Sequence, residues 1–288
     1  MIAVVGATGN TGRAVVRELV QLGHRPICLV RNAEKAAAIL GPQVTVKVAE
    51  LSDRNGLLTA LAGAERLFVV TGHSPQMVEQ QNNILDAAIA VGATYLVRVS
   101  GGAAVVQQNS ASVVGRGHFT IEQRLHASDI GWVILRPGLF MQNVLSQAAA
   151  IKNESKFSLP FPSDLPLALT DVGDTGAIAA RILANPAPHR NRTYHYTGAK
   201  TTYRQLAEDF SDVLGRKIIY VSLEIEEAVR AMKARGMPDW LVVHLTTIAK
   251  LGADGALSIE NTGPILEFLD RVPLTTKAFV RNHKDQFV

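Results

Sequence analysis

The chain has 288 residues, of which 47% are hydrophobic, and its 29 Lys and Arg against 25 Asp and Glu leave a net charge of +4. This length and hydrophobic content provide a sizeable core for one large domain, or for a large domain with a smaller one. The basic residues form no run interleaved with aromatic residues, and no stretch is long and apolar enough to span a membrane, so we expect neither nucleic acid nor a membrane as a partner.

A predicted strand at residues 2–5 runs directly into Gly6, Gly9 and Gly12. A pyrophosphate must approach backbone N–H groups closely, and glycines allow this because they have no Cβ. Three glycines also mark ordinary turns, but an apolar pattern with helical spacing follows at residues 15–22 and a second apolar strand at residues 26–30. This order favours a dinucleotide site over a plain strand-to-helix turn.

The second predicted strand ends at Arg31, about 20 residues beyond the glycines, where this type of fold recognises the adenosine ribose. An Asp or Glu there would bind the ribose hydroxyls of NAD, whereas Arg31, with Lys35 one helical turn later, suits the 2′-phosphate of NADP(H). The alternative is a solvated basic pair at the start of a helix. The same strand contains Cys28, the single cysteine, which favours a buried apolar residue over a nucleophile and excludes a disulfide within the chain. With the first strand beginning at residue 2, leaving no room for a signal peptide, this indicates a cytoplasmic protein.

Apolar strands then alternate with helical patterns, which predicts an α/β fold of the Rossmann type, a doubly wound parallel sheet covered by helices on both faces. The predicted strands are 44–48, 67–70, 95–100, 132–136 and 193–196, and the predicted helices are 57–61, 76–91, 117–127 and 175–183. Residues 152–170 contain three prolines and no helical period, so we interpret them as a loop or lid over the pocket. Helical patterns dominate beyond residue 201. We therefore predict a dinucleotide-binding domain at residues 1–150, with 172–198 returning to it, and a smaller, mostly helical, substrate-facing domain at residues 151–171 and 199–288.

The Tyr-x-x-x-Lys pair typical of short-chain dehydrogenases occurs only as Tyr196 and Lys200, and the surrounding pattern does not set these two residues on one helix face. The helix expected to hold that pair contains His118 and Glu122 instead, with spacing i and i+4. His118 is in register with apolar neighbours and so points toward the sheet. It can donate a hydrogen bond or a proton to a reduced substrate, with Glu122 orienting the ring; the alternative is a core histidine satisfied by its own helix.

Three further residues follow strands at the edge where ligands of this fold collect. Gly72 and His73 follow the fourth strand, and Ser100 ends the fifth. His73 is equally compatible with a solvated loop. Ser100 occupies the place of the usual short-chain serine, although Gly101 and Gly102 beside it indicate a tight turn. We assign no metal ligands.

Four segments together resemble the NmrA-like family of atypical short-chain dehydrogenases: residues 6–12, 29–32, 117–122 and 134–143. The stretches 192–207 and 215–217 are similar in kind. The resemblance implies that the NADP(H) site consists of the glycine turn with Thr8, Asn10 and Thr11, together with Gly72, Ser100, Pro137 and Gly138. It also implies that Pro137, Gly138 and Phe140 line the nicotinamide and acceptor, and we place His73, Phe140 and Asn143 in the substrate pocket.

Members of this family are of two sorts. Some are NADPH-dependent reductases of quinones, azo dyes or triphenylmethane dyes, which resemble this chain in having a histidine at the position of His118. Others bind NADP without turnover and act as redox sensors that contact a transcription factor. We predict a reductase of a small conjugated acceptor, with the sensor as the alternative. The sensor would need a protein partner, for which residues 224–240 with Val229, Met232 and Trp240 are the candidate surface; a homodimer is also possible.

Overall fold

The computed structural model describes residues 1–258 and 260–288. Its main sheet is parallel throughout and has seven strands: β1 (Ile2–Val5), β2 (Ile27–Val30), β3 (Thr45–Val48), β4 (Arg66–Val69), β5 (Tyr95–Val99), β6 (Gly131–Pro137) and β9 (Arg192–Tyr196). Their order is β3-β2-β1-β4-β5-β6-β9, so the direction of winding reverses between β1 and β4. All carboxyl ends of the strands therefore lie at one edge of the sheet, with the switch point beside the glycine turn.

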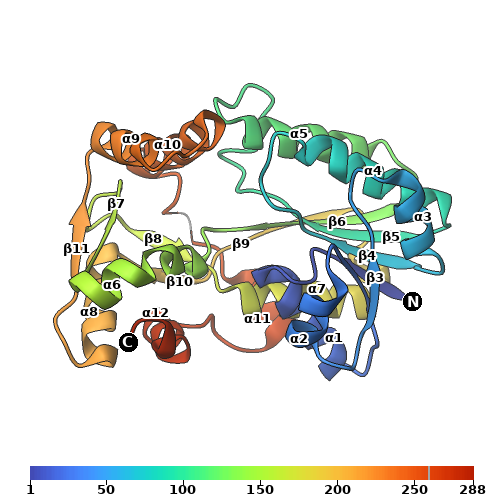
Figure 1. Ribbon diagram of the computed structural model, residues 1–288, viewed down its shortest axis with the longest axis horizontal. Helices are drawn as coiled ribbons and strands as arrows, with labels where there is room; N and C mark the ends of the chain where they lie inside the picture. Colours follow the sequence, from blue (N-terminus) through green and yellow to red (C-terminus); the bar gives the residue numbers. More distant parts are fainter. Residues whose placement is uncertain (259) are drawn as a thin grey trace.

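Helices cover both faces of this sheet, as Figure 1 shows. One face packs against α1 (Asn10–Gln21), α2 (Ala33–Leu40), α7 (Val172–Ala184) and α11 (Gly263–Leu269), and the other against α3 (Arg54–Leu61), α4 (Met77–Ala90) and α5 (Val113–His126). The central strands are buried on both sides, whereas the edge strand β3 is partly exposed. Continuous apolar strands are what a parallel sheet between two helical layers requires. The predicted α/β fold is confirmed.

The helix that carries His118 begins four residues earlier than predicted. The side chain of Ser112 accepts a hydrogen bond from the backbone N–H of Gly115 and so caps α5 at residue 113. Cys28 is buried in β2 as expected, and desolvation raises the pKa of its thiol to about 12.

Helix α7 fixes the position of α1, and with it the glycine turn. A Cβ at Gly176 would lie 2.6 Å from the Cβ of Ala14 and 2.9 Å from the backbone nitrogen of Val15. The two helices therefore touch closely at a point where only glycine fits. Such direct helix contact anchors the N-terminal half of α1 against the rest of the fold.

A second core lies beyond the sheet. It is formed by α6 (Ala148–Glu154), β7 (Lys156–Leu159), β8 (Leu167–Leu169), β10 (Ala199–Thr201), α8 (Tyr203–Leu214), β11 (Ile219–Ser222), α9 (Ile225–Ala234), α10 (Asp239–Ala253) and α12 (Thr276–Asn282). The expectation that residues 152–170 form a loop is wrong in part, because β7 pairs with β11 and β8 with β10. These strands have three or four residues each, too short to show a period, and Pro160, Pro162 and Pro166 lie between them.

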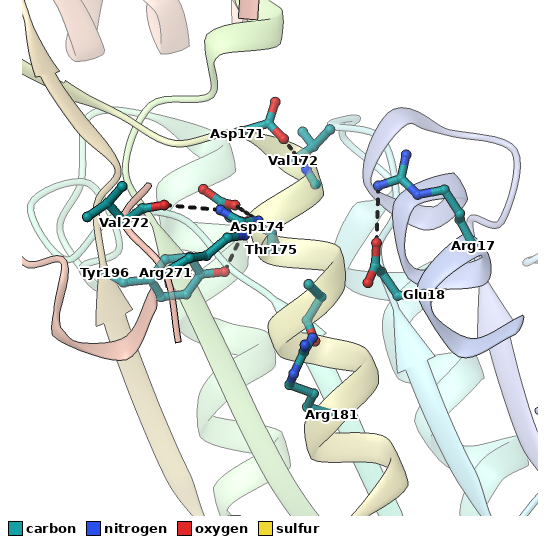
Figure 2. Close-up of polar contacts among 12 residues, drawn as sticks. Arg17, Glu18, Asp171, Val172, Asp174, Thr175, Arg181, Tyr196, Arg271 and Val272 are labelled. Atoms are coloured by element: carbon teal, nitrogen blue, oxygen red, sulfur yellow. Dashed lines mark hydrogen bonds and ion pairs between the residues drawn. The ribbon is translucent and has the colours of Figure 1, made fainter. Parts of the chain in front are cut away.

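The chain returns to the main sheet near its end. Ile265 of α11 is fully buried in the core beneath the sheet, although it lies in the range predicted for the smaller domain. Just beyond it, Arg271 donates a 2.5 Å hydrogen bond to the buried carboxylate of Asp174 on α7. Figure 2 shows this contact beside the hydroxyl of Tyr196, which donates to Thr175 at 3.1 Å. The end of the chain is thus attached to both cores.

Candidate functional site

The glycine turn between β1 and α1 leaves no space for a Cβ at two of its three glycines. Gly6 has φ +81°, and a Cβ there would lie 2.1 Å from the carbonyl oxygen of Val70. A Cβ at Gly12 would lie 2.0 Å from the carbonyl oxygen of Gly6. Gly9 differs, because its Cβ would meet only that same oxygen, at 3.4 Å, an ordinary contact. The fold itself therefore explains Gly6 and Gly12, but it does not explain Gly9.

The first turn of α1 faces outward from this loop. Gly9 is the N-cap residue and provides no side-chain hydrogen bond to the helix. Thr8 and Asn10 are exposed, Thr11 is mostly buried, and the side chain of Asn10 accepts a 2.9 Å hydrogen bond from Arg13. A helix N-terminus with free backbone N–H groups and no capping side chain is suited to bind a phosphate.

Arg31 follows β2 directly, at the same edge of the sheet, and Lys35 lies in the first turn of α2. Both are exposed, and within residues 1–258 and 260–288 neither side chain forms a hydrogen bond or ion pair. The start of α2 is instead capped by Asn32, whose side chain accepts from the backbone N–H of Lys35 at 2.9 Å. Both cations are thus available to a ligand beyond β2.

His118 lies in a buried polar network behind the carboxyl ends of β5 and β6. Its ring is 6% exposed, and its Nδ1 lies 2.8 Å from a terminal guanidinium nitrogen of Arg98. Arg98, 1% exposed within β5, also donates to Gln81 of α4 at 3.2 Å, and Gln81 donates to Thr71 at 2.9 Å. Burial chiefly, and then the charge of Arg98, hold the pKa of His118 well below its usual range.

The spacing on the helix predicted that Glu122 orients the His118 ring, but the two side chains form no direct hydrogen bond. The Glu122 carboxylate, 2% exposed, accepts a 2.5 Å hydrogen bond from Ser100 and is paired with Arg136 of β6 through both oxygens. Arg98 lies between the two helix residues, 3.8 Å from Glu122. The carboxylate therefore balances the buried Arg98 and the partly buried Arg136, and Arg98 makes the contact with the ring.

Two further imidazoles lie beside His118. The ring of His73 is 5.7 Å from that of His118 and 5.0 Å from that of His244 of α10, both in edge-to-face arrangement. The Nδ1 of His244 lies 2.8 Å from the hydroxyl of Ser112, the cap of α5. The His73 side chain is exposed at the surface, but the neighbouring protein still removes part of the water from its ring, and this desolvation lowers its pKa. Burial lowers the pKa of His244 to about 4. The rings are neutral at neutral pH and form one wall of the site.

The remaining predicted residues lie along the same edge but not all against His118. Gly72 follows β4 and is exposed. Pro137 ends β6, and the N–H of Gly138 donates to the carbonyl of Tyr196 at 2.8 Å. Phe140 packs partly against the main core, and Asn143 is exposed on the short 3-10 helix Met141–Gln147. Within the described parts of the chain, neither forms a hydrogen bond or an aromatic ring pair with the three imidazoles.

The Tyr-x-x-x-Lys match has no catalytic geometry, as its sequence context indicated. Tyr196 ends β9 and is 1% exposed, with its hydroxyl bound to Thr175, whereas Lys200 lies on β10 and pairs with Glu260 at the surface. Desolvation raises the pKa of the Tyr196 phenol above its ordinary value. This tyrosine is structural.

The model of the NmrA-like family matches residues 1–267. The chain belongs to the NmrA-like family. This member is 34% identical to an NAD(P)H azoreductase from Xenophilus azovorans, over 96% of the chain and 93% of that protein. It is 29% identical to quinone oxidoreductase 2 of Escherichia coli, over 84% of each. The crystal structure of the NADPH-dependent quinone oxidoreductase from Escherichia coli complexed with NADPH matches it with a TM-score of 0.85 at 27% identity, covering 99% of this chain and 100% of that one.

In this NmrA-like protein the predicted partner surface at residues 224–240 is not wholly free. Trp240 is half-buried and packs against the cluster of Met77, Val114 and Ile121 from α4 and α5. Val229 and Met232 are also partly buried. In the described parts of the chain no helix is long and apolar enough to cross a bilayer, and no three His, Cys, Asp or Glu side chains gather as metal ligands.

Proposed function

We propose that this protein is an NADPH-dependent reductase of a quinone-like or other conjugated acceptor, such as an azo or triphenylmethane dye. The observation that carries the proposal is the arrangement at the carboxyl edge of the sheet. There the glycine turn, open at Gly9, shares the edge with a buried histidine network that replaces the Tyr-Lys pair. The similarity to an azoreductase over nearly the whole chain supports it.

The residues present fit NADP(H). The turn brings free N–H groups of α1 to a space that a Cβ at Gly9 would narrow, which suits a pyrophosphate. Arg31 and Lys35 would bind the 2′-phosphate, which NAD lacks. Gly72, Ser100, Pro137 and Gly138 follow the strands further along the edge and would border the nicotinamide end. The Escherichia coli relative solved with NADPH has the same fold over the whole chain.

The bound nicotinamide would supply a hydride to an electron-poor acceptor. The protein's part is then to hold the acceptor and to stabilise the charge that develops on its heteroatom. His118 would donate a hydrogen bond to that atom, with His73, Phe140 and Asn143 lining the acceptor side. A quinone, or the quinoid ring of a triphenylmethane dye, becomes aromatic upon reduction, so no strong general acid is needed, which agrees with a structural Tyr196.

The test is NADPH oxidation followed by absorbance with a panel of quinones, azo dyes and triphenylmethane dyes, run beside NADH, after NADPH binding has been measured. We expect turnover that depends on one acceptor class and prefers NADPH. Tight NADPH binding without turnover on any acceptor would contradict the reductase and favour the redox sensor, with a protein partner. We assign the protein to the cytoplasm. We keep the two-domain division, except that α11 belongs with the main sheet. Size-exclusion chromatography tests the homodimer.

A further inference from the structure

We propose that Arg98 is a positioning residue that fixes His118 as the tautomer protonated on Nε2, so that His118 offers the acceptor a hydrogen bond and does not transfer a proton. The inference rests on the proposed function for the role of His118. Its structural part, the state of the ring, stands on the contacts of Arg98 alone.

The guanidinium of Arg98 is held on both sides. One nitrogen lies 2.8 Å from Nδ1 of His118, and Nε donates to Gln81 at 3.2 Å. Gln81 is held in turn, because its amide donates to Thr71. Arginine has only donors, so Nδ1 of His118 must be the acceptor in this contact. A neutral imidazole then carries its single proton on Nε2, the nitrogen on the far side of the ring from Arg98.

The charged and titratable groups that face the ring come, besides β5, from β6, from the loop after β4, from α10 and from α5 itself. Arg136 lies on β6, His73 follows β4, His244 lies on α10, and Glu122 lies on the same helix as His118. Glu122 is the sole carboxylate among them, and Ser100 and Arg136 occupy its oxygens. With burial, these surroundings disfavour an added proton on the ring, and the pKa of His118 is lowered accordingly.

This state decides the chemistry of reduction. Hydride supplied by bound NADPH would give a quinone two electrons and one proton, and one further proton would complete the hydroquinone. Loss of the Nε2 proton would leave an imidazolate beside a developing oxyanion, so His118 keeps its proton and water supplies the one that is needed. The Nε2–H group then acts as an oxyanion donor.

Two variants separate this role from packing. Arg98→Met retains much of the side-chain volume but removes the donor, and Arg98→Lys retains a cation without the planar fork. Arg66→Met is the matched control, because Arg66 also lies in a strand of the main sheet, at β4, but donates to the carbonyl of Leu183 at the opposite edge. The readout is the nitrogen-15 NMR spectrum of the histidine rings in the cofactor-free protein, with His118 assigned by loss of its signals in His118→Asn.

In the wild type and in Arg66→Met, we expect an unprotonated Nδ1 at His118 and no titration between pH 6 and 8. In Arg98→Met, we expect both tautomers and a titration nearer to the usual range of histidine. The kcat for a quinone should fall a few-fold, by the fraction of rings that lose the Nε2 proton, and by less than the roughly 10²-fold loss that removal of a whole oxyanion donor causes. Its NADPH affinity should be unchanged, and the pH-independent kcat of the wild type should become pH-dependent. Arg98→Lys should be intermediate.

A protonated Nδ1 at His118 in the wild type would overturn the proposal even if Arg98→Met does not fold. So would an unchanged His118 tautomer and titration in a folded Arg98→Met. If the wild type turns over no acceptor, the proposed function fails, while the NMR result still decides the role of Arg98.

Discussion

The glycine turn allows two nearly identical substitutions, Gly12→Ala and Gly9→Ala, to separate what the fold requires from what a ligand requires. A Cβ at residue 12 would lie 2.0 Å from the Gly6 oxygen, 2.7 Å from its carbonyl carbon and 2.9 Å from the Cα of Ala7. All three are backbone atoms that cannot rotate away. Overpacking of this kind costs about 1–3 kcal/mol. For a chain of this size, each kcal/mol lowers Tm by about 2–4 °C.

Gly9→Ala adds the same methyl group where the protein leaves space. The Cβ would lie 3.4 Å from its nearest protein atom, and the backbone, with φ −76° and ψ 167°, accepts any L-residue. Alanine is a poorer N-cap than glycine but reduces the entropy of the unfolded chain, and each effect is within about 1 kcal/mol. Stability should therefore change little. NADPH affinity should fall at least tenfold, because the methyl group occupies the space that we assign to the pyrophosphate.

Thermal unfolding and titration of NADPH by calorimetry measure both quantities on both variants. Unchanged NADPH affinity in Gly9→Ala would refute the placement of the pyrophosphate. A wild-type Tm in Gly12→Ala would refute the packing argument.

Three further predictions concern the charged and titratable groups of the site. Arg31→Ala should weaken NADPH binding roughly 10- to 100-fold and NADH binding little, since a charge-assisted hydrogen bond contributes about 1.5–3 kcal/mol; Arg25→Ala, before the other end of β2, is the control, and equal loss for both cofactors would exclude a 2′-phosphate role. His118→Asn places an amide oxygen near the position of Nδ1, so it should keep the contact with Arg98 and the wild-type Tm while kcat falls roughly 10²-fold; unchanged kcat would leave His118 as a core histidine. The pKa of buried His244 is lowered from 6.5 to about 4, so between these pH values the unfolded chain binds a proton that the folded protein does not. The free energy of unfolding should therefore fall by about 3 kcal/mol as the pH decreases from above 6.5 to 4. His244→Asn, which retains an acceptor for Ser112, should reduce the loss of unfolding free energy over this range; an equally steep loss would show that other groups cause it.

The main sheet could be predicted from sequence because its signals are local. Each central strand is predominantly apolar and is followed by a helix with a clear period. The glycine turn is local too, since Gly6 and Gly12 constrain each other across only six residues. The second core was less predictable, because its strands are short and paired with segments far along the chain, as β7 is with β11.

The buried network was missed in part, although one signal was available. Arg98 and Arg136 each interrupt an apolar strand that must be buried on both faces, and a buried cation requires partners. His118 and Glu122 were found from their helix spacing, but the prediction that they contact each other failed because Arg98 lies between them. His244 gave no local signal, since it reaches the site only when α10 packs on α5.

The return of the chain to the main sheet limits how members of such a family diversify. The second core is assembled from three separated segments, with α7, β9 and α11 committed to the sheet between them. A new acceptor preference therefore cannot be acquired by exchanging one contiguous segment that holds the whole second core. Any such exchange would also replace α7, which packs on α1, or remove the hydrogen bond from Arg271 to Asp174. Recombination at a single junction should yield mostly unfolded chimaeras, and variation by point substitution in place, on a scaffold that stays intact, is the route that this topology leaves open.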